Sequence, residues 1–252
     1  MATTIRRTLF YLVILAAWEV LFRLRLWPEF LFPSPFQVFR ALLEGFAEQR
    51  YLVGIATSLR RILVGYGVAV LLGTLLGLLQ ARWRFLDETL GSLILGLQTL
   101  PSICWLPLAL LWFGLNERAI IFVVIMGSLL SIAIATEHGV KHTPPLLIRA
   151  AQTMGARGLK LYVAVILPAA LPSVIEGMKQ GWSFAWRSLM AGELLFVSLG
   201  LGQLLSMGRE LNDMSQVVAV MLVIIGIGLG MDRLVFARLA TSVRHRWGLQ
   251  TP

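Results

Sequence analysis

Long apolar runs separated by short polar stretches dominate the pattern of this 252-residue chain. A helix that crosses a bilayer needs about 20 mostly apolar residues. The runs that approach this length lie at 8–27, 57–80, 90–113, 119–136, 174–197 and 217–236. The pattern therefore predicts an all-α, polytopic membrane protein with about six transmembrane helices.

Two of these runs carry signals beyond their hydrophobicity. The run 90–113 contains Pro101 and Pro107, and two prolines in one span predict a kinked or broken helix beside a cavity. In the run 57–80, Gly73 and Gly77 form a small-xxx-small face that lets another helix approach closely. We interpret this face as packing within the subunit, because the motif alone is a weak dimerisation signal.

Several polar segments are predicted to lie outside the apolar layer. Residues 28–35 contain three prolines and should end the first helix. Residues 36–50 alternate with helical period and are expected to form an amphipathic helix at the membrane surface. Residues 200–213 indicate a re-entrant turn followed by a short helix.

The segment 149–172 is the most polar long stretch between two apolar runs, yet it keeps helical periodicity. Gly155 and Gly158 allow a bend, and Pro168 and Pro172 should bracket the start of the next helix. A short polar helix cannot sit in lipid, so we expect a surface helix that offers an apolar face to a partner. Four residues can share that face of a helix over 149–160: Ala150, Ala151, Met154 and Leu159.

Composition and charge support a membrane protein. Charged residues make up 14% of the chain, whereas soluble domains carry about 25%. The net charge is +9, but no basic patch with interleaved aromatic residues lies outside the apolar runs, so nucleic-acid binding is not predicted. Six spans would place 12 of the 22 Lys and Arg residues on the side of the termini, against 8 opposite. This bias favours cytoplasmic termini, and the first run is interpreted as a retained span and not a signal peptide.

The chain shows no catalytic, cofactor-binding or metal-binding motif. His138 and His142 stand four residues apart, a spacing more typical here of a solvated helix end than of a metal site. The only cysteine is Cys104, so an intrachain disulfide is excluded. No lysine follows a glycine in the G-x-x-x-x-G-K-[ST] pattern that cradles phosphate. ATP-driven transport would therefore need a separate ATPase.

Polar residues within the apolar runs are the candidates for a substrate path, because charges are costly in lipid and normally face a cavity. Arg187 would give such a path a positive potential suited to an anion; the alternative is a structural pair with Glu19, or with Glu193 of a second copy. Glu176 and Lys179, three residues apart, are expected to pair with each other. The full set of path candidates is Gln98, Trp105, Ser131, Trp186, Arg187 and Glu193. The small polar members could instead hydrogen-bond to a neighbouring helix.

One motif resembles a known family. The Ala150-Ala151 pair, Gly155 and the later Ile166-Leu167-Pro168 are similar to the "EAA loop" in permease subunits of ABC importers. In that family the loop is a coupling helix that docks into the cytoplasmic ATPase. The resemblance implies coupling roles for Arg149, Ala150, Ala151, Met154, Gly155, Leu159 and Pro168. The acidic residue that names the motif is Arg149 here, so a salt bridge from that carboxylate cannot form.

Other stretches resemble the nitrate/sulfonate/taurine/bicarbonate branch of these permeases, at 57–79, 100–117, 185–194 and 200–205. The resemblance implies a type I ABC importer permease in the bacterial inner membrane. It implies a homodimer with two ATPase subunits, which bind ATP and Mg²⁺, and an extracytoplasmic solute-binding protein. The expected parts are an N-terminal span with a surface helix (1–56), a core permease domain with a coupling helix at about 145–160 (57–240) and a cytoplasmic tail (241–252).

Two other classes of protein fit the sequence less well. A secondary transporter or channel without a nucleotide partner would predict inverted repeats, and the chain shows no convincing repeat. An intramembrane enzyme would need a nucleophile with its base, or a metal set, and the sequence offers neither. Substrate identity does not follow from the sequence, because a separate binding protein would set most of the selectivity.

Overall fold

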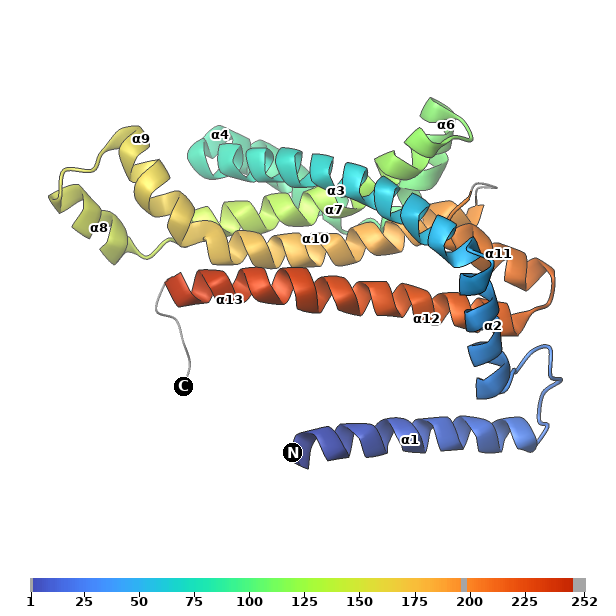
Figure 1. Ribbon diagram of the computed structural model, residues 1–252. Coiled ribbons are helices and arrows are strands. Elements are labelled where there is room, and N and C mark those ends of the chain that lie inside the picture. Colours follow the sequence, from blue (N-terminus) through green and yellow to red (C-terminus); the bar gives the residue numbers. More distant parts are fainter. Residues whose placement is uncertain (1, 196–198, 247–252) are drawn as a thin grey trace. The chain divides into compact units, whose positions relative to one another are not determined.

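The computed structural model describes residues 2–195 and 199–246, and all regular elements in these two ranges are helices (Figure 1). The all-α class is therefore confirmed. The last two residues of the predicted run 174–197 and the end of the tail, 247–252, lie outside the described residues. The α-helices are α1 (Ala2–Arg23), α2 (Pro35–Ala47), α3 (Arg50–Arg82), α4 (Arg84–Leu86), α5 (Ser92–Gln98), α6 (Leu106–Phe113), α7 (Glu117–Lys141), α8 (Pro145–Thr153), α9 (Gly158–Leu161), α10 (Leu167–Leu195), α11 (Leu201–Glu210), α12 (Met214–Met231) and α13 (Ala237–Arg246).

Short turns of other helix types join several of these elements. Asp87–Gly91, Tyr162–Ile166 and Asp232–Phe236 are π-helical, and Ser102–Trp105 is a 3₁₀ turn. The chain divides into two compact units, Met1–Ser58 with Glu193–Gly226 and Leu59–Gly192 with Ile227–Pro252. We call the first of these units the terminal unit and the second the core unit.

Four helices among the described residues are long and apolar enough to cross a membrane: Arg50–Arg82, Glu117–Lys141, Gly158–Leu195 and Met214–Val243. The pair Arg84–Gln98 and Ser102–Phe113, bent by 104°, adds a fifth if it counts as one span. Helix α1 is not among them, because Arg7 and Glu19 confine its uncharged stretch to residues 8–18. The expected count of six spans is thus not confirmed.

The bent pair confirms the prediction from Pro101 and Pro107. Helix α5 ends at Gln98, Pro101 has an extended ψ of 134°, and α6 begins at Leu106 with Pro107 in its first turn. Proline lacks the N–H that a continuous helix would require and restricts the residue before it. The span is therefore broken at the first proline and restarts around the second.

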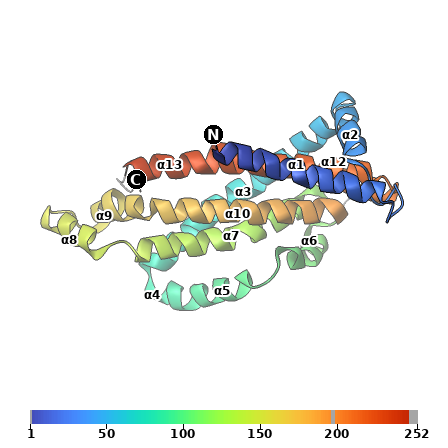
Figure 2. The ribbon, with the colours of Figure 1, turned by 90° about the horizontal axis from the view of Figure 1, so that it is seen from below.

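Helix α7 is the centre of the core unit, with α10 on one side and α5 on the other (Figure 2). Glycines allow its close contacts: a Cβ on Gly77 of α3 would lie 2.6 Å from the Cβ of Thr136, and one on Gly181 of α10 would lie 2.8 Å from Cγ1 of Ile132. The Gly73-x-x-x-Gly77 face thus packs within the subunit, as predicted.

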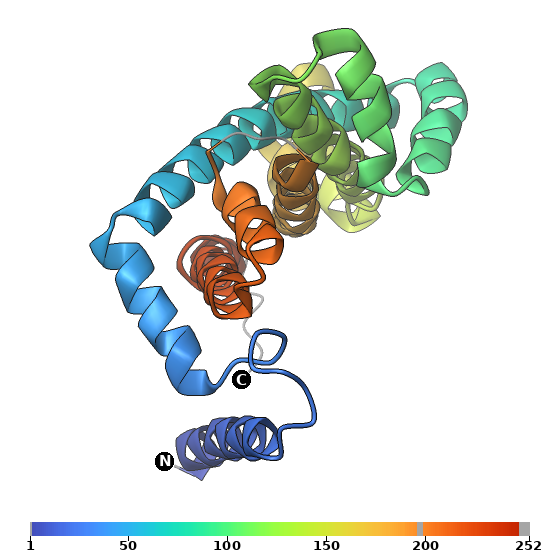
Figure 3. The same cartoon turned by 90° about the vertical axis from the view of Figure 1, so that its right-hand side faces the viewer.

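In the terminal unit, local sequence signals explain where α2 begins and ends. Ser34 and Gln37 form a capping box, in which the Ser34 hydroxyl accepts the Gln37 N–H and the Gln37 side chain accepts the Ser34 N–H. After α2, Gln49 has a φ of 61°, and the chain turns sharply into α3 (Figure 3). The proline-rich break and the following amphipathic helix were both predicted correctly.

The helix that contains Pro168 and Pro172 differs from expectation. It begins at Gly158 and runs without interruption to Leu195, so the prediction that the two prolines bracket a helix start is wrong. The π-helical segment Tyr162–Ile166 lies just before Pro168. A π turn shifts the pattern of backbone hydrogen bonds, so the helix continues past a residue that cannot donate one.

Candidate functional site

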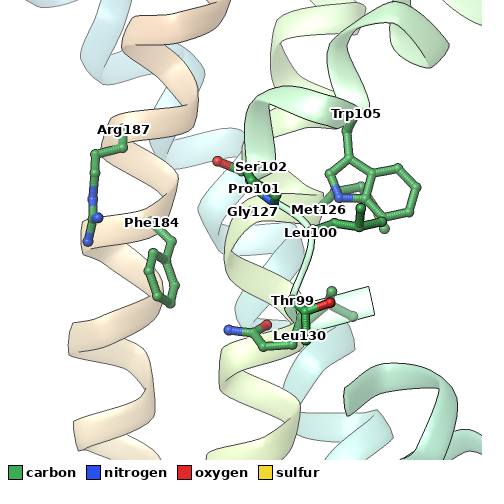
Figure 4. Close-up of a pocket in the computed structure, with 11 residues that line it drawn as sticks. Thr99, Leu100, Pro101, Ser102, Trp105, Met126, Gly127, Leu130, Phe184 and Arg187 are labelled. Atoms are coloured by element: carbon green, nitrogen blue, oxygen red, sulfur yellow. The ribbon is translucent and has the colours of Figure 1, made fainter. Parts of the chain in front are cut away.

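A cavity of about 270 Å³ in the core unit lies where the broken span faces α7 and α10 (Figure 4). Three path candidates line it: Gln98 at the end of α5, Trp105 at the end of the 3₁₀ turn, and Arg187 on α10. A Cβ on Gly127 of α7 would lie 3.2 Å from the Cβ atoms of both Ser102 and Ser188. The broken span, α7 and α10 therefore approach one another closely at this cavity, which we call the Arg187 cavity.

Arg187 is the only charged residue that lines this cavity among the described residues. Its Nε donates to the carbonyl oxygen of Ser183 at 3.2 Å, and its guanidinium carbon lies 5.0 Å from the centre of the Phe184 ring. No carboxylate in the described part of the chain lies within ion-pair distance of it, and Glu19 pairs with Arg23. A cation held by a ring and a carbonyl keeps donors for an anionic ligand.

The other path candidates on α7 and α10 lie elsewhere. Ser131 is buried on α7, donates to the carbonyl oxygen of Ser128 at 3.0 Å and lines a neighbouring cavity of about 400 Å³. Trp186 is buried beside Trp182, their rings inclined by 15°. Trp186 and Arg187 both line a third cavity, of about 390 Å³, which Lys179 and Asp232 also line. The candidates are thus distributed over three cavities and one buried cluster.

The expected pair of Glu176 and Lys179 does not form. Lys179 Nζ lies 2.7 Å from a carboxylate oxygen of Asp232, which connects α10 to the last span. The spacing of three residues allows Glu176 and Lys179 to pair within one helix. Such a pair stabilises a helix by only about 0.5 kcal/mol, so a better-placed partner on another helix can replace it.

Glu193 lies in a buried hydrogen-bond network of the terminal unit. The side chain is 0% exposed. Its two carboxylate oxygens accept from the Ser58 hydroxyl at 2.9 and 2.7 Å, and one also accepts from the Gly202 N–H at 3.0 Å. The Ser58 hydroxyl in turn accepts the N–H of Leu201 at 2.9 Å. The carboxylate and the Ser58 hydroxyl therefore each accept one of the free N–H groups at the start of α11, where negative charge is favourable.

Two glycines make this arrangement possible, and sequence reasoning missed their role. A Cβ on Gly200 would lie 2.6 Å from the carboxyl carbon of Glu193, and one on Gly202 would lie 2.5 Å from its Cβ. The sequence does contain a signal for this role, since Gly200 and Gly202 flank Leu201 in the predicted turn before a short helix. Its partner, Ser58, is 135 residues away from Glu193 and could not be assigned.

The network predicts that Glu193→Ala lowers stability more than it alters a substrate path. Loss of the carboxylate leaves the Gly202 N–H and the Ser58 hydroxyl without this acceptor in a buried site, which costs on the order of 3 kcal/mol. Thermal unfolding of the detergent-solubilised transporter measures this cost. Glu44→Ala, which removes an exposed carboxylate paired with Arg40 at 2.8 Å, is the matched control. Unchanged stability with lost uptake would instead favour a role in the path.

The predicted coupling segment is not a single helix over 149–160. Helix α8 ends at Thr153, and Gly155 has a φ of 85°. The Ala156 N–H donates to the carbonyl oxygen of Ala151 at 2.9 Å, and the Gly155 N–H donates to that of Gln152 at 3.0 Å. These two bonds form a Schellman motif, which ends a helix at a left-handed glycine. The sequence predicts a bend at Gly155, but in the structure α8 ends before this residue.

The residues expected to share one coupling face are therefore separated. Ala151 is only 4% exposed, whereas Met154 is 81% exposed. Leu159 lies on the next helix and lines a cavity with Arg82, Lys141 and Tyr162. Arg149, Ala150 and Gly155 are exposed, and Pro168 is half-buried inside the long helix.

Sequence reasoning missed the most exposed large apolar residue of α8. Leu146, in the first turn of α8, is 77% exposed. It lies before the segment that matched the motif, and the helical pattern of α8 could have included it. With Met154 it gives α8 and its following turn two large apolar side chains that are more than three-quarters exposed, and we call these two residues the α8 surface.

No group of three or more His, Cys, Asp or Glu side chains in the described ranges could hold a metal ion. The rings of His138 and His142 stack with centres 3.8 Å apart, and His142 Nδ1 lies 2.9 Å from the carbonyl oxygen of His138. The pair thus interacts within the end of α7.

Comparison with known proteins gives one consistent result. Residues 69–239 match the family described as the binding-protein-dependent transport system inner membrane component. An ABC transporter permease protein of Methanocaldococcus jannaschii is 38% identical over 177 residues, which cover 70% of this chain and 66% of that protein. The taurine transport system permease protein of Escherichia coli strain K12 is 31% identical over 203 residues, which cover 79% of this chain and 74% of that protein.

A solved structure shares the fold. A chain of the MetNI methionine ABC transporter, in an inward-facing conformation, superposes with a TM-score of 0.63 at 20% identity. The match covers 75% of this chain and 94% of that one. At this identity the similarity concerns the fold alone.

Proposed function

Because the chain belongs to the family of binding-protein-dependent transport system inner membrane components, we propose that it carries a small anionic solute through the membrane for an ATP-driven importer. The solute is of the sulfonate, taurine, nitrate or bicarbonate type. Membership of the family makes the chain an ABC permease subunit, a transport component without its own ATPase site. The observation that supports an anionic substrate is the position of Arg187 at the cavity beside the broken span. Among the described residues this cation has no carboxylate partner.

The α8 surface supports coupling to a separate ATPase. Leu146 on α8 and Met154 in the turn after it expose large apolar side chains, and α8 follows a helix long enough to span a membrane. Exposed apolar groups on a surface helix mark a site for a partner. ATP and Mg²⁺ would act on that partner, and ATP binding there would shift the permease between its two conformations through α8.

Charge supports a cytoplasmic position for α8. The ends of α3 and α7 and the start of the long helix at Gly158 lie at one end of the core unit (Figure 1). Basic residues gather in these segments: Arg82, Arg84, Lys141, Arg149, Arg157 and Lys160. Such residues favour the cytoplasmic side. We place the chain in the inner membrane with both termini cytoplasmic, as half of a homodimer that receives solute from an extracytoplasmic binding protein.

Purification of the tagged chain from its native membranes in mild detergent tests this proposal. We expect a second, untagged copy and a soluble ATPase to be recovered with it. Recovery of the chain alone, with solute still crossing reconstituted vesicles without ATP, would favour the alternative of a secondary transporter or channel.

Replacement of Arg187 tests the anionic path. Arg187→Gln should lower the initial uptake rate at least tenfold, since a lost charge-assisted contact to an anion costs about 1.5–3 kcal/mol. Arg187→Lys, which keeps the charge, should retain a larger share of the rate. Copurification of the ATPase should be unchanged in both variants. If assembly is lost instead, Arg187 pairs structurally with another subunit and the path must lie elsewhere.

A further inference from the structure

The cavity that Ser131 lines adjoins the Arg187 cavity and carries a different charge. It has a volume of about 400 Å³ and lies between the end of α5, α7 and α10. Six of its lining residues are polar: Gln98, Ser131, His138, Ser173, Glu176 and Gln180. Polar side chains in spans normally face a water-filled space or protein and not lipid. We call it the Glu176 cavity.

The two cavities follow each other along one groove. They share Gln98, and on α7 the first is lined up to Leu130 and the second begins at Ser131. On α10 the lining residues follow each other at intervals of three and four: Ser173, Gly177, Gln180, Phe184 and Arg187. This spacing places them on one face of the helix. The lining therefore continues from one cavity to the next.

The ends of this groove have opposite charges. Arg187 and Glu176 are 11 positions apart on α10, which corresponds to about 16 Å along the helix axis. Glu176 is exposed and forms no ion pair among the described residues, because its neighbour Lys179 pairs with Asp232 at 2.7 Å. Glu176 also lies nearer to the α8 end of α10, the end that we assign to the cytoplasm.

We propose that the two cavities are successive positions of one water-filled path and that Glu176 repels an anion from the inner one. The inference rests on the proposed function, since it assigns a role to a residue of the same path. An anion that leaves Arg187 moves toward a fixed carboxylate, and in water this repulsion shortens its stay in the inner cavity roughly twofold at a separation of about 8 Å. Glu176 thus speeds release on the cytoplasmic side, while ATP on the partner sets the direction.

Charged thiol reagents can measure the potential in the inner cavity without knowledge of the substrate. The probe is Gln180→Cys in a Cys104→Ser background, because the single native cysteine is exposed. In membrane vesicles that contain the assembled transporter, we compare the labelling rates of cationic and anionic methanethiosulfonates. We expect both to react, and Glu176→Gln to lower the ratio of cationic to anionic rates roughly tenfold. Glu88→Gln, which removes an exposed carboxylate paired with Arg84, should leave the ratio unchanged.

Two results would overturn the inference. Absence of labelling at Gln180→Cys would mean that lipid or a second copy covers the cavity, so that no water-filled path passes there. If Gln180→Cys is labelled but Glu176→Gln leaves the ratio of cationic to anionic labelling rates unchanged, Glu176 has no electrostatic role in this cavity. Neither result affects recovery of the ATPase, so failure of this inference is distinct from failure of the proposed function.

Discussion

Gly77→Val is expected to destabilise the core unit strongly. A Cβ at this position would lie 2.6 Å from the Cβ of Thr136 and 3.0 Å from the backbone nitrogen of Glu137, both on α7. Backbone atoms cannot rotate away as the end of a flexible side chain can, so α3 and α7 would have to separate. Overpacking of this kind costs on the order of 3 kcal/mol, a large part of the stability of a typical fold.

Gly67→Val on the same helix is the matched control for Gly77→Val. A Cβ at Gly67 meets no atom within 4 Å, so the two variants change helix propensity equally and differ in packing. Yield after detergent extraction and the temperature of unfolding should fall for Gly77→Val, the latter by about 10 °C, and stay near wild type for Gly67→Val. Equal behaviour of the two variants would show that the α3–α7 contact is unimportant for stability.

The sequence predicted the spans of the core unit well because hydrophobicity and proline act locally. The runs at 57–80 and 119–136 correspond to α3 and α7, and the break at Pro101 lies where it was expected. The resemblance to ABC importer permeases of the sulfonate and taurine branch is confirmed, since the matched family and the taurine permease both agree with it. These features depend on composition and spacing within short segments.

Features that depend on distant partners were not predictable in the same way. The sequence paired Lys179 with a residue three positions away, but its partner is Asp232 on another helix. The sequence makes Glu193 a path candidate but does not indicate that its carboxylate accepts a hydrogen bond from Ser58, which is 135 residues away. Helix periodicity also extended through Gly155, whose φ of 85° ends α8. A pattern identifies which residues are costly in an apolar region, but only the fold supplies their partners.

Substitutions in the α8 surface are expected to have the second large effect, on binding of the ATPase. The double variant Leu146→Asp Met154→Asp should lose the ATPase during purification. A carboxylate that is moved from water into an apolar groove loses several kcal/mol, and each 1.4 kcal/mol weakens binding about tenfold. Uptake should then stop, although the permease itself folds, because both side chains are more than three-quarters exposed. Ala151 is a poor site for this test, since its burial would make a substitution disturb α8 itself.

Leu115→Asp provides the control for the α8 variant. Leu115 is 79% exposed and precedes α7, whereas α8 follows it, so the two positions are separated by a 25-residue helix of about 38 Å. Leu115→Asp should keep the ATPase and most of the uptake, because it adds its carboxylate at the opposite end of the core unit. Retention of the ATPase by the double variant would show that the partner docks elsewhere. Loss of the ATPase from both variants would point to general destabilisation. Only loss confined to the double variant identifies α8 as the element to which the ATPase docks.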